Sequence, residues 1–190
     1  MITAYTFPFD SIKDRIIITC SVSLPNSDDS QAELHRALWD TGATTTCISL
    51  SLAKKLGLMP VDTVKNVVGA NNEPFSAPVY CVQIRMGRFV IPIHNVIGLP
   101  MDGTDREVII GMDIISKGDL SITNYSGRTI ITFRTPSLEA INYVDELNLQ
   151  NKCDKMHVLN VRNNRPDKCA CGSGRDYKNC HGQSPYSRNR

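Results

Sequence analysis

The chain has 190 residues, of which 41% are hydrophobic, and its net charge is +2. This length fits one domain with an appendage and excludes a chain of two full-sized domains. The charge is unevenly divided: residues 1–150 hold 12 Lys and Arg against 16 Asp and Glu, whereas residues 151–190 hold 9 against 3, so an acidic body precedes a basic tail.

The sequence favours a cytoplasmic protein without a membrane segment. The longest apolar stretch near the start, residues 16–18, has the length of a strand and not of a membrane helix. The first ten residues lack the cationic and apolar regions of a signal peptide. We therefore expect a cytoplasmic chain that does not contact a membrane.

The predicted elements are mainly strands up to residue 136. Alternation of apolar and polar residues predicts strands at 15–24, 34–39, 44–48, 64–68, 75–82, 81–86, 88–93, 120–124 and 129–134. Two short helices are expected, one between the N-cap Ser49 and the stop at Gly57, the other over 113–117 with Asp113 as its cap. A helix over 138–149 and a linker over 150–166 should follow.

A turn of sequence Asp40-Thr41-Gly42-Ala43 follows the predicted strand 34–39. Two carboxylates in such turns can meet across a two-fold axis, share one proton and activate a water molecule against a peptide bond. The chain contains the motif once. An active site of this kind therefore requires two chains. The alternative is a turn carboxylate that only caps nearby amides.

Three features together resemble the retropepsin-like aspartic proteases, and the resemblance covers roughly residues 12–136. They are the Asp40 turn, the helix after it, and the apolar stretch 108–110 that runs into Gly111, where another backbone could approach closely. The resemblance implies a closed, mainly β acid-protease barrel with short helices, in a domain spanning 1–136. It also implies a homodimeric active site under two flaps. The element order matches cellular and bacterial members better than viral ones.

The residues of the turn have distinct expected roles. Asp40 from each chain would act as general base and general acid in turn. Thr41 could hydrogen-bond across the dimer, and Gly42 lets a backbone amide approach the carboxylate. Ala43 has no hydroxyl to favour the ionised carboxylate, so we expect a pH optimum less acidic than that of gastric pepsins. No cofactor is needed for this chemistry.

The hairpin around residues 69–73 is the predicted flap, since it lies between the turn and the apolar-Gly segment in the family order. Gly69, Ala70 and Asn71, together with Ala43, are the predicted substrate contacts. The alternative is an ordinary surface hairpin. The expected substrate is a peptide or protein.

The tail carries Cys169, Cys171, Cys180 and His181, a ligand set for tetrahedral zinc. Four protein ligands leave no open position, so the site should be structural and should stabilise a small unit over 167–190. Two disulfides are the alternative, which the odd total of 7 cysteines disfavours. The segment 167–182 resembles the SEC-C motif, which implies docking to a protein or ribosome. Only Tyr177 and Tyr186 could stack on bases, which disfavours nucleic acid.

Other reactive side chains receive structural interpretations. His35 should lie on the opposite strand face from its neighbours, and Cys153 with His157 has metal-pair spacing but no second pair nearby. The thiols of the strand-like segments are expected to be buried and free; they are Cys20, Cys47 and Cys81.

Three functions remain open at this point. The first is a homodimeric aspartic endopeptidase, a hydrolase, with a zinc-bound docking tail. The second is a non-catalytic domain of retropepsin fold for dimerisation or peptide binding. The third is an adaptor that acts through the zinc tail. The intact Asp-Thr-Gly sequence favours the first.

Overall fold

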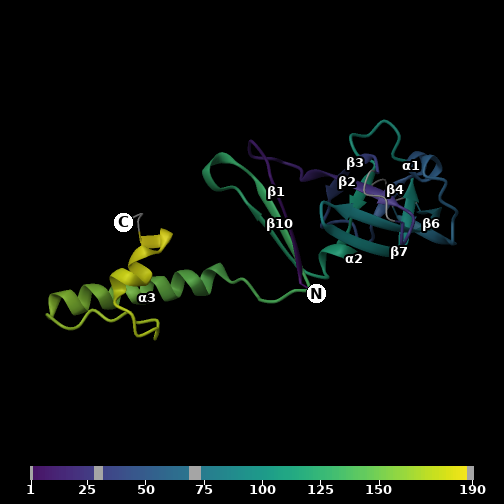
Figure 1. Cartoon of the computed structure of the whole chain (residues 1–190). Helices are drawn as coiled ribbons and strands as arrows, with labels where there is room; N and C mark the ends of the chain where they lie inside the picture. The colour runs from purple at the N-terminus through teal and green to yellow at the C-terminus, as the bar shows by residue number, and fades with distance from the viewer. Residues whose placement is uncertain (1, 28–31, 69–73, 188–190) are drawn as a thin grey trace. The chain divides into compact units, whose positions relative to one another are not determined.

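The computed structural model describes residues 2–27, 32–68 and 74–187. The chain forms two compact units, Met1–Leu138 and Glu139–Arg190 (Figure 1). Each is described by itself below.

The first unit is built on a closed barrel. Its strands are β2 (Ile17–Ser23), β3 (Leu34–Trp39), β4 (Cys47–Ser49), β5 (Asp62–Val68), β6 (Pro74–Met86), β7 (Phe89–Leu99) and β8 (Val108–Ile110). They lie in the order β2-β3-β8-β4-β7-β6-β5, and β2 also pairs with β6. That last pairing closes six strands into a barrel and leaves β5 outside it. The predicted mainly β, closed barrel with short helices is confirmed.

The barrel interior holds the alternating apolar residues of these strands. Ile18, Cys20 and Val22 of β2 are buried, as the period of two in a strand requires. Trp39 and Phe89 pack on Phe133 with ring centroids 5.2 and 5.7 Å away, respectively. The core therefore extends to a second sheet, which contains Phe133.

This second sheet has three strands in the order β1-β10-β9. Figure 1 shows β1 (Thr3–Pro8) alongside β10 (Ile130–Thr135), and β9 (Asp119–Thr123) pairs with the other edge of β10. A short 3-10 turn, η1 (Tyr125–Gly127), connects β9 and β10. The sequence did not predict β1. Its exposed residues, Ala4, Thr6 and Pro8, alternate with half-buried ones but include an alanine and a proline, so the strand lacks a clear alternation of apolar and polar residues.

The first helix lies where its capping residues predicted it. In α1 (Leu50–Lys55) the Ser49 hydroxyl accepts a hydrogen bond from the Leu52 amide, and Gly57 has a φ of +65° after the helix. The second helix, α2 (Met112–Ile115), begins at Gly111, so the prediction of Asp113 as its cap is wrong. Strand β4 is shorter than the predicted strand 44–48, because Thr44 to Thr46 form a loop.

The second unit contains one long helix, α3 (Tyr143–Arg162), whose N-cap is Asn142. The predicted linker over 150–166 is wrong, because the helix continues through most of it. The buried face of α3, at Gln150, Cys153 and Asp154, faces the 3-10 turns η2 (Tyr177–Asn179), η3 (His181–Gln183) and η4 (Pro185–Ser187). Polar composition suggested a linker, but the helix is stabilised by the tail that folds against it. No helix in the described ranges is long and apolar enough to span a membrane.

Candidate functional site

Asp40 lies in a turn whose backbone orients its carboxylate. The Gly42 amide donates to Asp40 Oδ1 over 2.9 Å, and the Asp40 amide donates to the Ile110 carbonyl over 3.0 Å. A Cβ on Gly42 would lie 3.2 Å from the same Oδ1, closer than most such contacts allow. Asp40 is half-buried, whereas Thr41 and Gly42 are exposed. The turn therefore holds the Asp40 carboxylate in place, because one of its two oxygens accepts a backbone hydrogen bond.

Strand β8 supports this turn from the side. It runs parallel to β3, with Trp39 opposite Ile110. After the strand ends, Gly111 lies against the loop that leaves the turn, and a Cβ there would come within 2.7 Å of the Thr45 carbonyl carbon. The Met112 amide donates to the Ala43 carbonyl over 2.8 Å. The close approach predicted at Gly111 is present, and a side chain at this position would displace the loop.

A buried threonine and an aspartate lock the same loop, and the sequence did not assign either to the site. The Thr46 hydroxyl donates to Asp113 Oδ1 over 2.7 Å, and the Thr46 amide donates to the same oxygen over 2.9 Å. The Gly111 amide donates to the Thr46 hydroxyl over 3.1 Å. Thr46 is fully buried. Asp113 thus holds the loop after Asp40, and the same oxygen accepts the Ile114 amide in the first turn of α2 over 3.0 Å.

We predict that Thr46→Val lowers the free energy of unfolding of the barrel by about 2–4 kcal/mol, since a buried amide and a carboxylate lose their shared hydroxyl. Urea denaturation followed by Trp39 fluorescence measures this, because the single Trp lies buried in the barrel. Thr44→Val is the matched control in the same loop, where the side chain is exposed. Equal midpoints for the two variants would contradict the assigned role.

Three other titratable side chains of this unit are buried in the fold. His35 is buried, and its Nδ1 lies 2.9 Å from Glu107 Oε2. Cys20 and Cys47 are buried free thiols as predicted, and burial raises the pKa of each to about 12. Cys81 is only half-buried, so the prediction was wrong there.

For the predicted flap, the structure describes the two flanking strands, β5 and β6, and not the turn between them. Strands β5 and β6 pair antiparallel from Asp62 opposite Val79 to Val68 opposite Pro74. Gly69, Ala70 and Asn71 lie outside the described residues, so their contact with substrate stays a prediction.

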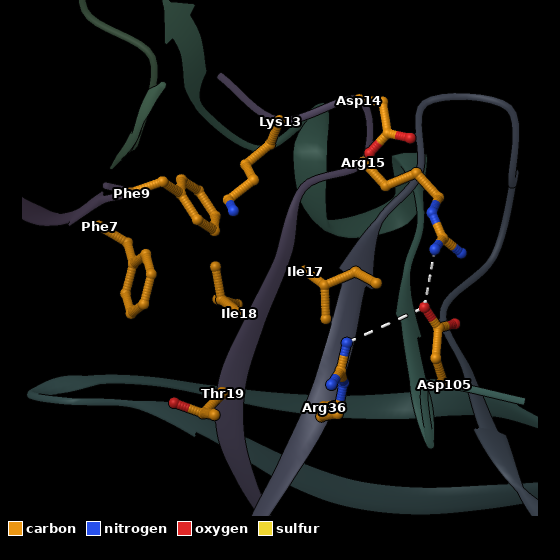
Figure 2. A pocket seen from close by; sticks show the side chains of 10 residues that line it. All are labelled: Phe7, Phe9, Lys13, Asp14, Arg15, Ile17, Ile18, Thr19, Arg36 and Asp105. Carbon is orange, nitrogen blue, oxygen red and sulfur yellow. Dashed lines mark ion pairs between the residues drawn. The ribbon is translucent and has the colours of Figure 1, made fainter. Parts of the chain in front are cut away.

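A cavity of about 470 Å³ lies elsewhere in this unit (Figure 2). It is lined by Phe7, Phe9, Lys13, Asp14, Arg15, Ile17, Ile18, Thr19, Arg36 and Asp105. Figure 2 shows Arg15 and Arg36 both directed at Asp105, with nitrogen–oxygen distances of 3.0 and 3.9 Å. Asp40 is not among the described residues that line this cavity, so it is separate from the Asp40 turn.

The second unit brings together the four predicted metal ligands. One donor atom from each of Cys169, Cys171, Cys180 and His181 lies within 4.8 Å of every other. The Sγ atoms of Cys171 and Cys180 are 3.6 Å apart, and His181 Nδ1 lies 3.2 Å from Cys169 Sγ. Zinc–sulfur bonds of about 2.3 Å in a tetrahedron place two sulfurs about 3.8 Å apart. The donor set therefore fits a tetrahedral ion.

The chain around the cluster is preorganised for this convergence. Gly172 and Gly174 have φ values of +83° and +72°, so the backbone turns sharply between the first and second ligand pairs. The Cys169 amide donates to the Arg175 carbonyl over 2.9 Å across this turn. Hydrogen bonds from the Ser173 hydroxyl and amide lower the pKa of Cys171 to about 6.

Helix α3 supports the cluster from behind. Gln150 donates to the His181 carbonyl over 3.2 Å, and the Tyr177 hydroxyl donates to Asp154 over 2.7 Å. His157 stacks on Tyr177 with ring centroids 4.2 Å apart, and its Nδ1 lies 2.8 Å from Asp167. His157 is therefore a packing residue and stands outside the four-residue metal cluster.

Comparison with known proteins agrees with both parts. Residues 31–117 match the family model described as "gag-polyprotein putative aspartyl protease", and residues 165–183 match the SEC-C motif. No curated protein matches the chain. The predicted resemblance to retropepsin-like aspartic proteases, with a SEC-C motif at the C-terminal end, is confirmed.

Solved structures with a similar fold include three proteases or protease-like domains. A retropepsin-like aspartic protease from Rickettsia conorii is 15% identical, with a TM-score of 0.44, over 71% of this chain and 96% of that one. EIAV protease bound to the inhibitor HBY-793 is 15% identical, with a TM-score of 0.40, over 55% and 88%. The retroviral protease-like domain of Ddi1 from Leishmania major is 16% identical, with a TM-score of 0.36, over 56% and 79%. Likeness at this level carries no information on activity or substrate.

Proposed function

Since the chain is retropepsin-like over residues 31–117 and carries a SEC-C motif over residues 165–183, we propose that it is a homodimeric aspartic endopeptidase with a zinc-bound docking tail. The observation that carries the proposal is the supported Asp40 turn. One carboxylate oxygen accepts the Gly42 amide, while Gly111 and Thr46 hold the loop that follows. Such a turn can present a carboxylate to a second copy of itself.

In this mechanism the two Asp40 carboxylates share one proton. The ionised member takes a proton from water as the water attacks the scissile carbonyl carbon. The protonated member polarises the carbonyl oxygen and then gives its proton to the leaving nitrogen. Thr41, which is exposed at the turn, would hydrogen-bond to the partner turn and keep the two carboxylates at a fixed separation. Gly42 keeps its amide against the carboxylate.

The substrate in this proposal is an extended peptide segment. The β5–β6 hairpin would cover it, with Gly69, Ala70 and Asn71 as contacts from above and Ala43 from below. An extended chain suits this place because its backbone amides and carbonyls can pair with a flap strand, so binding depends on main-chain groups before side chains.

The tail has a separate proposed role. Cys169, Cys171, Cys180 and His181 would hold zinc, and the metal would supply folding energy without chemistry, because the four ligands fill its coordination sphere. The folded unit would then dock a protein or ribosomal partner. The second candidate function is an adaptor that acts through this unit alone. Hydrogen bonds join Gln150 and Asp154 of α3 to the tail, and this favours a unit that can fold and bind without the barrel.

A peptide-mixture assay tests the enzymatic proposal. The full chain is incubated with diverse peptides from about pH 4 to 7.5, the span in which shared-proton dyads work, and products are identified by mass spectrometry. We expect cleavage, with an optimum less acidic than that of gastric pepsins, and a specific activity that rises with protein concentration as dimers form. Absence of cleavage by a protein shown to be folded and dimeric would favour the adaptor.

A further inference from the structure

One thiol of the second unit has no role in the proposed metal site. The unit contains four cysteines, and three of them are the candidate ligands. The fourth, Cys153, lies on α3 and is fully buried, with its Sγ 3.6 Å from the Sγ of Cys169. A ligand sulfur and a free thiol are therefore in direct contact.

This contact is fixed by the packing on both sides of Cys153. Gln150, one turn before it, donates to the His181 carbonyl, and Asp154, next to it, accepts from the Tyr177 hydroxyl. Both partners belong to the tail that carries the ligands. Because the helix is attached to the tail at these points, the two sulfurs stay within reach of each other whenever the unit is folded.

The separation suits bond formation between the two sulfurs. A disulfide has an S–S length of about 2.05 Å, so the two sulfur atoms, 3.6 Å apart, need to approach by about 1.5 Å. The exposed fraction is 0% for Cys153 and 6% for Cys169. Thiols of other protein molecules therefore have little access to either sulfur, and the intramolecular disulfide partner is favoured; hydrogen peroxide is small enough to reach Cys169 through its exposed 6%.

We propose that Cys153 and Cys169 form an oxidation site, at which hydrogen peroxide converts the two thiols into a disulfide and thereby removes a ligand from the metal cluster. The disulfide itself does not depend on the proposed zinc site; only the release of metal rests on it. Cys153 then serves as the resolving thiol for an oxidised ligand.

The chemistry balances in two steps. The Cys169 thiol gives up its proton as its sulfur attacks peroxide, so that an S–O bond forms, the O–O bond breaks, and the departing hydroxide takes that proton to become water. The Cys153 sulfur then attacks the resulting sulfenic acid; the S–S bond forms, the S–O bond breaks, and the Cys153 proton leaves with the oxygen as a second water. Two thiols are oxidised by two electrons and one peroxide is reduced to two waters.

The consequence follows from the ligand count. Once Cys169 is in a disulfide, Cys171, Cys180 and His181 remain, and three ligands hold zinc more weakly than four. Metal therefore leaves the oxidised chain. Because the disulfide keeps α3 joined to the tail, the chain can return to the four-ligand state after reduction.

The test uses the full chain, purified under reducing conditions, with its zinc content measured first. The protein is treated with hydrogen peroxide, free thiols are alkylated, and disulfides are mapped by mass spectrometry, while a colorimetric chelator follows the metal released. We expect a Cys153–Cys169 linkage, reversed by dithiothreitol, and release of zinc several-fold faster than from Cys153→Ala. The matched control is Cys81→Ser, a half-buried thiol of β6, which should behave as the unchanged chain.

The outcomes separate the two proposals. A linkage between Cys171 and Cys180, whose sulfurs are also 3.6 Å apart, in place of Cys153–Cys169 would overturn the inference. So would equal rates of release from the unchanged chain and Cys153→Ala. A chain that binds no zinc would contradict the proposed metal site, and disulfide mapping would still decide the oxidation site. Mapping on the unchanged chain also decides it where Cys153→Ala does not fold.

Discussion

Replacing Asp40 with Asn removes peptide-bond cleavage, by more than about a thousandfold, because an amide can neither take a proton from water nor donate one as an acid. The fold should persist, since Asn presents an oxygen of the same size to the Gly42 amide, which lies 2.9 Å from Asp40 Oδ1. Peptide cleavage read by mass spectrometry gives the activity, and Trp39 fluorescence reports the folded barrel. Asp102→Asn, at an exposed loop residue, is the control and should retain full activity.

A mixing experiment shows whether the site needs two copies of Asp40. When subunits exchange freely, a tenfold excess of Asp40→Asn chains leaves about a tenth of the unchanged chains in active pairs, so activity should fall to about a tenth. If each chain worked alone, the excess would leave activity unaltered. That second result, or a fully active Asp40→Asn protein, would contradict the shared dyad and favour the adaptor.

The parts of the site that the sequence predicted depend on local signals. Ser49 and Gly57 mark a helix by their own side chain and backbone preference, and Gly111 marks a close approach because it lacks a Cβ. The turn at Asp40 is recognisable because its residues are contiguous. Features of this kind can be predicted from the sequence without knowledge of the rest of the fold.

The parts that the sequence missed depend on partners far along the chain. Thr46 and Asp113 are 67 residues apart and meet only because β3, β4 and β8 adjoin in the barrel. Nothing in either residue's neighbourhood indicates the other. The extent of α3 was missed for the same reason, since its buried polar residue Gln150 finds a partner at His181, 31 positions later. At these places hydrogen bonds between residues far apart in the chain decide the structure, and the local amino-acid composition does not predict it.

Removing the metal from the zinc-loaded chain should unfold the second unit and leave the barrel intact. Structural zinc supplies about 10–16 kcal/mol of folding energy in small zinc-dependent peptides at neutral pH, more than a unit of this size gains from its core. Once the tail opens, α3 loses the carbonyl and hydroxyl partners of Gln150 and Asp154, and a helix in a protein owes most of its stability to such tertiary packing.

Two probes separate the units in this experiment. Among the α-helices of the described ranges, α3 has 20 residues while α1 and α2 have 6 and 4, so circular dichroism at 222 nm reports mainly α3. Trp39 fluorescence reports the barrel alone. On addition of a strong chelator we expect more than half of the helical signal to disappear with the Trp39 spectrum unchanged, and readdition of zinc to restore it.

Single substitutions test whether the loss of helical signal depends on the metal ligands. His181→Ala should reproduce the loss of helical signal in the presence of zinc, because it leaves three ligands and an open coordination position. His94→Ala, at an exposed position of β7, should not. A helical signal that persists after zinc is shown to have left would mean that α3 and the tail pack without the ion. The contacts of Gln150, Asp154 and His157 would then suffice to hold the unit, and its fold would not depend on the metal concentration.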